Sequence, residues 1–297
     1  MTLTDEILSE VDPQGWDTPN KFDTILLRAH SGEGWSRKVD NKLRLSWSLL
    51  KSGLTCIRSA TWSVYPEKFG INPEDLLFTD SLPSIRGSIT QTLVEHIYLH
   101  SYLKLNPEEF IQALQASWRW GLLQHKPESI LKPKQIIKVR NEIFAVLPTI
   151  LETMNRETFW ANSMSLEKPL WWDMPSMGGV RLTGKADLVL QDSDKYWLID
   201  GKYCSKPECQ DARQLTFYAL ILSKMTGKVP QRALFWFYPQ GEVRDYSKDT
   251  LTPIAMQSIL DDAFRVATKI KLYEDDTTPS TYNCKWCPHR THCSDCA

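Results

Sequence analysis

The amino-acid sequence predicts an α/β fold, with a mixed central sheet flanked by helices and a large helical insertion before the core of the sheet. Three observations predict this class. Helical patterns occupy residues 46–160. Two short runs of β-branched or aromatic residues, 188–190 and 196–199, surround a turn-like segment, which is typical of a hairpin. A helical pattern at 207–224 then leads into an apolar strand at 232–238, and this order favours a layered α/β domain.

The chain is expected to begin with a peripheral arm at residues 1–45, followed by a helical region at 46–165. Ser46 is a typical N-cap residue, and a short helix should run from it to Cys56. An apolar stripe at 88–103 predicts the next helix. The helical region therefore precedes the sheet and should cover part of it.

Two longer helices should complete this region. Asn106 is followed by a proline and two glutamates, which predicts a helix start, and that helix should reach about residue 123. The pattern at 133–159 predicts another, with a bend at Pro148. The helical region contains the densest basic stretch, which fits either a solvated helix face or a contact with the DNA backbone. This stretch consists of Lys132, Lys134, Lys138 and Arg140.

The core of the sheet is expected within residues 166–250, and residues 251–297 should form a closing helix followed by a cysteine-rich segment. Glycines mark the boundaries, because they favour turns and helix C-termini. The remaining elements expected are, in order, a strand near 169–172, a turn at Gly178-Gly179 into a strand at 180–182, the hairpin, a helix at 207–224 ended by Gly227, strands at 232–238 and 243–246, and a helix at 251–273.

Composition excludes several classes of protein. The 297 residues carry 35 Lys and Arg against 36 Asp and Glu, so a DNA-binding surface would have to be local rather than general. No apolar run approaches the 18 or so residues of a membrane span, and the first twenty residues lack the apolar centre of a signal peptide. We therefore expect a cytoplasmic protein with no membrane partner.

The hairpin places three chemically active side chains together. Asp187 lies on its first strand, and Asp200 and Lys202 lie near the end of its second. Because side chains on a strand alternate with a period of two, Asp200 and Lys202 point to the same face, where Asp187 can join them. Carboxylates are the ligands that Mg²⁺ prefers. The pattern fits a divalent-metal site, and it also fits an ordinary ion pair on a surface hairpin.

The flanking residues favour the metal site. Gly184-x-x-Asp187, Asp200-x-Lys202 and Gln214-x-x-x-Tyr218 follow one another in that order. Together they resemble the PD-(D/E)xK nuclease superfamily, and within it the RecB-type branch, which includes the nuclease domains of RecB and AddB and the CRISPR-associated RecB-like exonucleases. The resemblance implies a restriction-endonuclease-like fold whose nuclease core is residues 166–250.

The same resemblance implies roles for these residues. Asp187 and Asp200 would bind Mg²⁺ or Mn²⁺ with help from the backbone carbonyl of Gly201, and Lys202 would be the catalytic lysine. Gln214 and Tyr218, which lie four apart on one helical face, would line the site or the path of the DNA.

The helix expected at 88–103 departs from the family pattern. The family often has Gly-x-x-x-His-x-x-x-Glu here, with the histidine near the metal. Gly87 and Glu95 fit, but Gln91 stands in place of the histidine. Glutamine can coordinate a metal weakly or form hydrogen bonds, but it cannot act as a base at neutral pH. We expect Glu95 to complete the acidic shell and Gln91 to be a candidate metal ligand.

The cysteines form a second signal. Four of the seven lie after residue 283, and thiolates are soft ligands that suit iron–sulfur clusters or zinc. The family resemblance implies a 4Fe–4S cluster held by Cys56, Cys284, Cys287 and Cys293. The rival interpretation is a local zinc knuckle in which Cys296 is the fourth ligand and Cys56 is free.

These patterns predict a metal-dependent deoxyribonuclease that hydrolyses phosphodiester bonds, in particular an exonuclease acting on single-stranded DNA ends. A partner nuclease, helicase or integrase would fit the resemblance, in CRISPR spacer acquisition or in DNA repair. Two alternatives remain open. One is a non-catalytic DNA-binding or adaptor module that keeps the fold, and the other is a zinc-knuckle nucleic-acid binder.

Overall fold

The computed structural model describes residues 42–72, 82–102, 106–125, 132–157, 163–204, 206, 208, 210–280, 284–285 and 287–295. Nearly all of the predicted N-terminal arm, and Cys296, therefore lie outside the described residues. Within them, no helix combines the length and the apolar character needed to cross a membrane.

A mixed sheet forms the centre of the molecule, as the sequence predicts. Its six strands in the described part are β1 (Leu43–Leu45), β2 (Ser163–Asp173), β3 (Val180–Asp192), β4 (Lys195–Lys202), β5 (Arg232–Phe237) and β6 (Glu242–Asp245). The order is β1-β3-β4-β5-β6, and β2 pairs with β3. Pairs β1–β3 and β4–β5 are parallel, whereas β2–β3, β3–β4 and β5–β6 are antiparallel.

Strand β3 organises this sheet because it pairs with three others. Strand β2 follows it from Arg181 to Gln191, and β1 joins it only at residues 180–182. The β3–β4 ladder runs from the turn down to the pair Leu188–Ile199. Asp187 and Asp200 come directly after this last pair, so the two carboxylates lie where β3 and β4 stop pairing.

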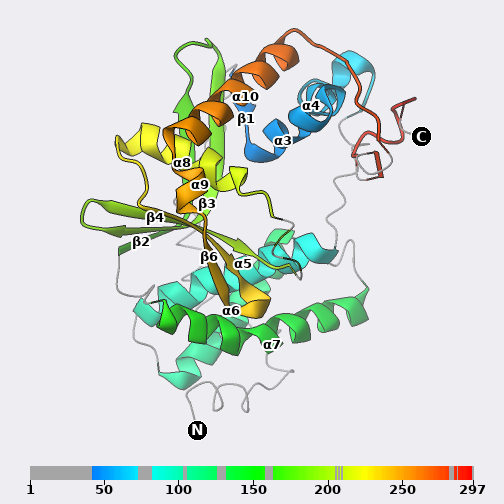
Figure 1. Ribbon diagram of the computed structural model, residues 1–297. Helices are drawn as coiled ribbons and strands as arrows, with labels where there is room; N and C mark the ends of the chain where they lie inside the picture. The colour runs from blue at the N-terminus through cyan, green and yellow to red at the C-terminus, as the bar shows by residue number, and fades with distance from the viewer. Residues whose placement is uncertain are drawn as a thin grey trace.

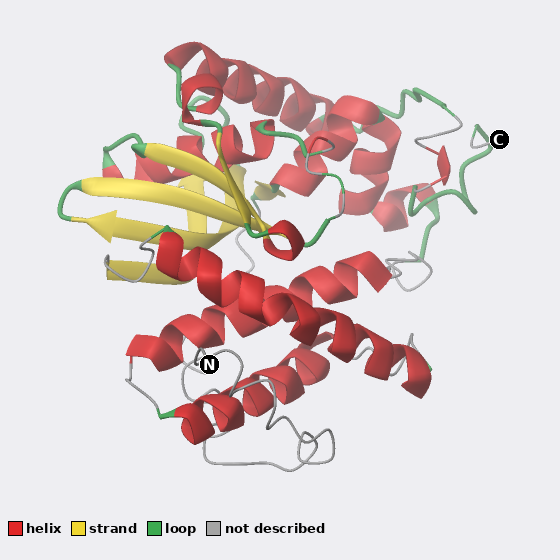
Figure 2. Ribbon diagram, turned by 60° about the horizontal axis from the view of Figure 1, so that its bottom comes forward, coloured by secondary structure: helices red, strands yellow, loops and turns green. Residues whose placement is uncertain are grey.

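Helices cover both faces of the sheet (Figures 1 and 2). One layer contains α3 (Trp47–Thr55), α4 (Ile57–Val64), α8 (Arg213–Thr226), α9 (Ser247–Thr250) and α10 (Pro253–Lys271). The other contains α5 (Leu82–Tyr102), α6 (Pro107–His125) and α7 (Pro133–Arg156). Two short 3₁₀ turns, η2 (Pro66–Phe69) and η7 (Tyr238–Gln240), complete the described elements. The C-terminal segment lies beside α4 in Figure 1.

Two hydrophobic cores separate the layers. Alternate residues of β5 enter each of them: Phe235 and Phe237 pack on the α8 side, and Leu234 and Trp236 pack on the side of α5 and α7. This is the period-two alternation of a strand that is buried on both faces. Strand β4 is also covered on both faces, and its end carries the candidate site.

Most predicted helix boundaries are confirmed. The Ser46 hydroxyl accepts a hydrogen bond from the backbone N–H of Leu49 at 3.2 Å, and Cys56 is the C-cap of α3. The Asn106 side chain accepts one from the N–H of Glu109 at 2.9 Å at the start of α6. Both bonds satisfy helix N–H groups that have no partner within the helix.

Several expectations were wrong in detail. The helix expected at 88–103 begins earlier, at Leu82. The helix predicted from residue 207 begins only at Arg213, because the Asp211 carboxylate accepts from the N–H of Arg213 at 3.1 Å and fixes a turn there. The strand expected at 180–182 continues through the hairpin as one strand, β3. Strand β1 was not predicted, since three residues carry too little pattern to be recognised as a strand.

Candidate functional site

The end of β4 carries a closed set of polar contacts. Asp200 is only 2% exposed, and its carboxylate pairs with the ammonium group of Lys202. Lys202 Nζ also donates to Gln214 Oε1 at 2.9 Å, and Gln214 Nε2 donates to Asp200 Oδ1 at 3.1 Å. Each of the three side chains thus orients the other two.

Helix α8 supplies Gln214 and Tyr218 from one face, as their spacing predicts. Gln214 Nε2 lies 3.1 Å from the Tyr218 hydroxyl. Tyr218 in turn packs against Gly184 of β3, where an added Cβ would lie 2.7 Å from the ring carbon Cε1. The glycine of the Gly-x-x-Asp pattern therefore allows the tyrosine to lie directly on the strand.

Asp187 joins the set through the backbone of β4. Its Oδ2 accepts a hydrogen bond from the N–H of Gly201 at 2.8 Å. This contact links β3 to β4 one step beyond their last ladder pair. The structure therefore brings Asp187, Asp200, Gly201 and Lys202 together at one edge of the sheet.

Helix α5 brings Gln91 and Glu95 to the same region from the opposite face. Glu95 is 3% exposed, and its Oε1 accepts from Gln91 Nε2 at 3.0 Å. Gln91 Oε1 accepts a hydrogen bond from the hydroxyl of Tyr238. Burial raises the pKa of Tyr238 well above its usual value, and the carboxylates of Asp187, Glu95 and Asp200 raise it further.

Electrostatics at this edge favour an added cation. Burial raises the pKa of the Asp200 carboxyl, although the Lys202 ammonium acts in the opposite direction. Burial alone would lower the pKa of Lys202, but Asp200 and Asp187 outweigh it and the pKa is raised. Lys202 is therefore an ammonium ion at neutral pH. Asp187 and Asp200 both act on this lysine, and together with Glu95 they also act on Tyr238.

The donor set fits a hard divalent cation. It consists of carboxylate, amide and backbone oxygens, which suit Mg²⁺ or Mn²⁺, and a buried carboxylate with a raised pKa gains from a cation beside it. In the described part of the chain, however, no three His, Cys, Asp or Glu side chains meet as a metal-binding group. The oxygens contact Lys202, the N–H of Gly201 and Gln91 instead.

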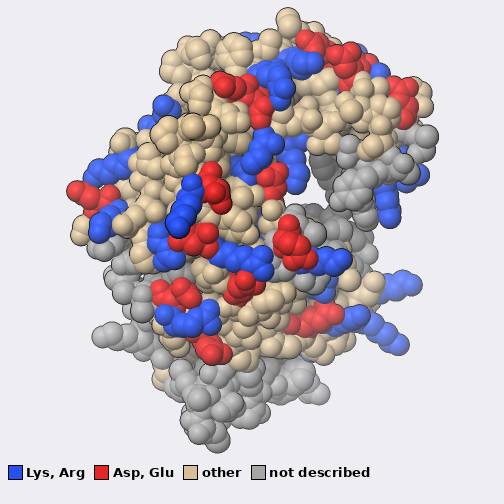
Figure 3. Space-filling model, in the orientation of Figure 1, with Lys and Arg blue, Asp and Glu red and all other residues tan. Residues whose placement is uncertain are grey.

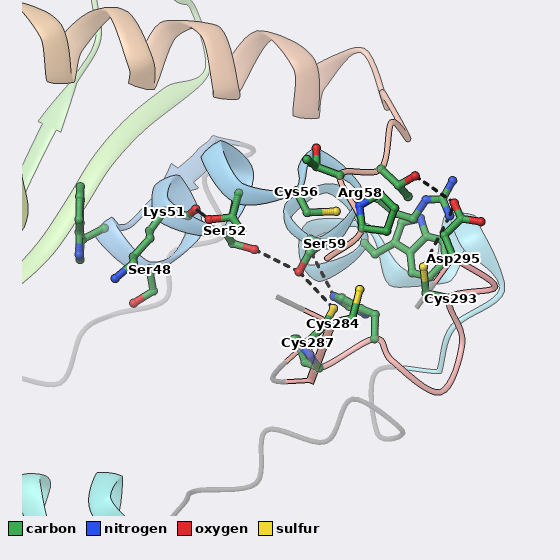
Figure 4. A pocket seen from close by; sticks show the side chains of 18 of the residues that line it. Ser48, Lys51, Ser52, Cys56, Arg58, Ser59, Cys284, Cys287, Cys293 and Asp295 are labelled. Carbon is green, nitrogen blue, oxygen red and sulfur yellow. Dashed lines mark hydrogen bonds and ion pairs between the residues drawn. The ribbon is translucent and has the colours of Figure 1, made fainter. Parts of the chain in front are cut away.

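A second feature is a cavity of about 690 Å³ between α3, α4 and the C-terminal segment. Cys56, Cys284, Cys287 and Cys293 all line it. In Figure 4 their sulfur atoms face a common space, although they come from two distant parts of the sequence. The thiols therefore surround one cavity without forming a compact metal-binding group.

Arg58 ties this cavity together. Its guanidinium contacts Asp275 at 2.9 Å. It also contacts Asp295 at 2.9 Å and donates to the sulfur of Cys293 at 3.6 Å (Figure 4). These contacts fix the C-terminal segment against α4. A guanidinium beside a sulfur favours its thiolate form, which is the form that binds metals.

The cavity adjoins the acidic edge, because Gln214 lines it together with Trp47 and Lys51 of α3. One residue therefore contacts both features. Over the face shown in Figure 3, acidic and basic side chains intermix, and neither sign dominates among the residues drawn in colour. A DNA contact there would have to be local, as the composition indicates.

Sequence reasoning missed Tyr238 and the role of Arg58. Tyr238 ends an apolar strand and has no spacing relation to Gln91, so no local signal could have identified it. Arg58 follows Cys56 by two residues, a position that suggests proximity to the cysteines but not the contact with Cys293.

Comparisons with known proteins give one family. The family model described as "PD-(D/E)XK nuclease superfamily" matches residues 44–294. A search of curated proteins finds no significant match. A solved structure titled "Crystal structure of SSO0001" is similar at 12% sequence identity and a TM-score of 0.40, over 93% of this chain and 95% of that one. A TM-score of that size carries no argument here.

Proposed function

This chain belongs to the PD-(D/E)XK nuclease superfamily, and on that premise we propose that it is a metal-dependent deoxyribonuclease. The observation that carries the proposal is the contact set of Asp187, Asp200, Lys202 and Gln214 at the end of the β3–β4 hairpin. It combines acidic side chains with a fixed cation at one end of the sheet.

Asp187 and Asp200 would hold Mg²⁺ or Mn²⁺, with the Gly201 carbonyl and Gln91 as further ligands and Glu95 completing the acidic shell. When bound, such an ion lowers the pKa of water and stabilises charge on a phosphate. The chain's own contribution is to hold these oxygens on two packed strands and a helix.

Lys202 would act as an ammonium group, because its raised pKa keeps it protonated at neutral pH. It would orient the attacking water and stabilise the negative charge that develops on the phosphate. Gln214 holds Lys202 through its amide oxygen and Tyr218 through its amide nitrogen. Both α8 residues would therefore act by positioning.

For the substrate we propose single-stranded DNA ends cut exonucleolytically, with a helicase, nuclease or integrase as partner. A non-catalytic DNA-binding module is the second candidate. One observation favours it: the acidic oxygens are engaged by Lys202 and by neighbouring protein groups rather than meeting at one point.

A metal-dependent digestion separates the two candidates. We expect the purified chain to shorten end-labelled single-stranded DNA with Mg²⁺ or Mn²⁺, and to leave it intact in excess chelator. Circular single-stranded DNA is the matched substrate, since an exonuclease that requires ends should not cut it. If linear DNA is bound but never cut with either ion, the binding module is favoured.

We also propose that Cys56, Cys284, Cys287 and Cys293 hold a 4Fe–4S cluster, with zinc as the alternative. The four thiols around one cavity support this proposal, and a cluster spans more space than a single ion does. Such a centre would join α3 and α4 to the C-terminal segment, which are far apart in sequence.

Anaerobic purification tests the cluster. We expect a brown protein absorbing at about 400 nm, as iron–sulfur centres do, with about four irons per chain. Cys284→Ser should lose most of this absorbance, because it removes a ligand. Cys204→Ser is the matched control, since Cys204 is not in a disulfide and does not line the cavity. A colourless protein that holds one zinc ion per chain would reject the cluster and support the zinc alternative.

A further inference from the structure

Tyr238 is a buried tyrosine whose hydroxyl lies inside the candidate cation site. It directly follows β5 and is 1% exposed. Its ring packs edge-on against Trp236, with the ring centroids 4.8 Å apart. The ring is thus held by packing, and Tyr238→Phe would remove the hydroxyl while keeping this packing.

Gly201 provides the space for this hydroxyl. A Cβ at Gly201 would lie 1.8 Å from Tyr238 Oη and 2.8 Å from Gln91 Oε1. The Tyr238 hydroxyl and the Gln91 amide therefore fill the position where the side chain of residue 201 would stand. Gly201 itself separates Asp200 from Lys202, so the hydroxyl touches the backbone that carries both.

The direction of the hydrogen bonds follows from chemistry. An ionised carboxylate only accepts, so the Gln91 amide must present its NH₂ group to Glu95. Its oxygen then faces Tyr238, which can only be the donor in that contact. Tyr238 thereby determines where the Gln91 oxygen points, and Gln91 in turn holds Glu95.

Tyr238 also joins two halves of the site that come from opposite sides of the sheet. Gln91 and Glu95 belong to α5 on one face, whereas Lys202 contacts Gln214 of α8 on the other. Burial, followed by the nearby charges of Asp187, Glu95 and Asp200, keeps the hydroxyl protonated at neutral pH because all of these raise its pKa. It is therefore a permanent donor.

We propose that Tyr238 is a positioning residue of the cation site. Its hydroxyl, seated against Gly201, holds the Gln91 amide so that the α5 half of the site faces Asp187 and Asp200. This inference rests on the proposed function for the identity of the cation. It concerns cation binding, however, and can be measured without DNA cleavage.

Tyr238→Phe tests this role, because phenylalanine keeps the ring and removes only the hydroxyl. We expect the dissociation constant for Mn²⁺, measured by calorimetry without DNA, to rise about tenfold, the usual cost of losing a group that orients a metal ligand. The Mg²⁺ concentration for half-maximal cleavage should rise in parallel, while cleavage at saturating Mg²⁺ is largely retained. Asp200→Asn removes a proposed ligand, so the part of the binding heat that disappears in this variant belongs to the cation site.

Two further variants separate positioning from a purely structural role. Tyr65→Phe removes the hydroxyl of a partly buried tyrosine whose ring packs on Tyr273, and it should leave Mn²⁺ binding unchanged. Gln91→Leu removes the acceptor of the Tyr238 hydrogen bond together with a proposed ligand, and should weaken binding at least as much as Tyr238→Phe does. The Mn²⁺ dissociation constant of the double variant should be close to that of Gln91→Leu alone, because Tyr238 acts on the site through Gln91.

The outcomes distinguish this inference from the nuclease proposal. Unchanged Mn²⁺ binding in Tyr238→Phe, with only a lower melting temperature, would overturn the positioning role and leave the nuclease proposal intact. A wild-type chain that binds Mn²⁺ but cuts no DNA would reject the nuclease. Weaker binding in Tyr238→Phe would still support the positioning role in that case.

Discussion

Replacing Lys202 with alanine is expected to reduce metal-dependent cleavage of single-stranded DNA by about a thousandfold, the size of effect that follows loss of one group aimed at developing charge. The reason is local. Lys202 is the cation held between Asp200 and Gln214, and alanine leaves no charge at that point. Single-turnover rates with DNA bound at saturation measure the chemical step separately from DNA affinity.

Lys195→Ala is the matched control, because Lys195 begins the same strand at its other end and is exposed. It should retain the wild-type rate. Near-normal cleavage by a folded Lys202→Ala protein would remove Lys202 from the catalytic set. Asp200→Asn extends the test, since it keeps the shape of the side chain and removes the negative charge.

Gly201→Ala is expected to lower the free energy of unfolding by about 3 kcal/mol, at the upper end of the usual cost of overpacking a buried position. A methyl group there would lie 1.8 Å from Tyr238 Oη and 2.3 Å from Cζ. The tyrosine is fully buried and cannot move aside without disturbing the core around α5 and α7. Urea or thermal unfolding measures the loss.

Gly178→Ala is the control for Gly201→Ala, since no heavy atom lies within 4 Å of a Cβ built there. Its stability should stay within about 0.5 kcal/mol of wild type, as for most surface substitutions. Equal stabilities of the two variants would mean that β4 and Tyr238 are not packed as described. Metal-dependent cleavage by Gly201→Ala should also fall, because the added methyl group would lie 2.8 Å from Gln91 Oε1 and displace that amide.

The parts of the fold that could be predicted depend on local patterns. The hairpin follows from two apolar runs around a polar turn, and the period of two places Asp200 and Lys202 on one face. The spacing of Gln214 and Tyr218 likewise needs only the geometry of one helix. In each case the residues that interact lie within one element or in adjacent ones, where spacing determines distance.

What the sequence could not predict depends on distant contacts. Gln91 meets Gly201 only because α5 packs on the face of the sheet opposite α8, and no spacing rule relates these segments. The start of α8 at Arg213 depends on the Asp211 carboxylate, whereas the helical pattern begins earlier. Strand β1 is recognisable only through its pairing with β3.

The three partners of β3 have a consequence for the order in which the chain folds. Pairing of β3 with β4 closes a short loop, which costs little entropy and is fast, whereas pairing of β1 with β3 must wait for a long loop to close. Asp187 and Asp200 therefore meet early, before the parallel strand secures the far end of β3. Like charges brought together at that stage repel each other, so we expect dissolved divalent ions to speed the formation of the hairpin by screening that repulsion.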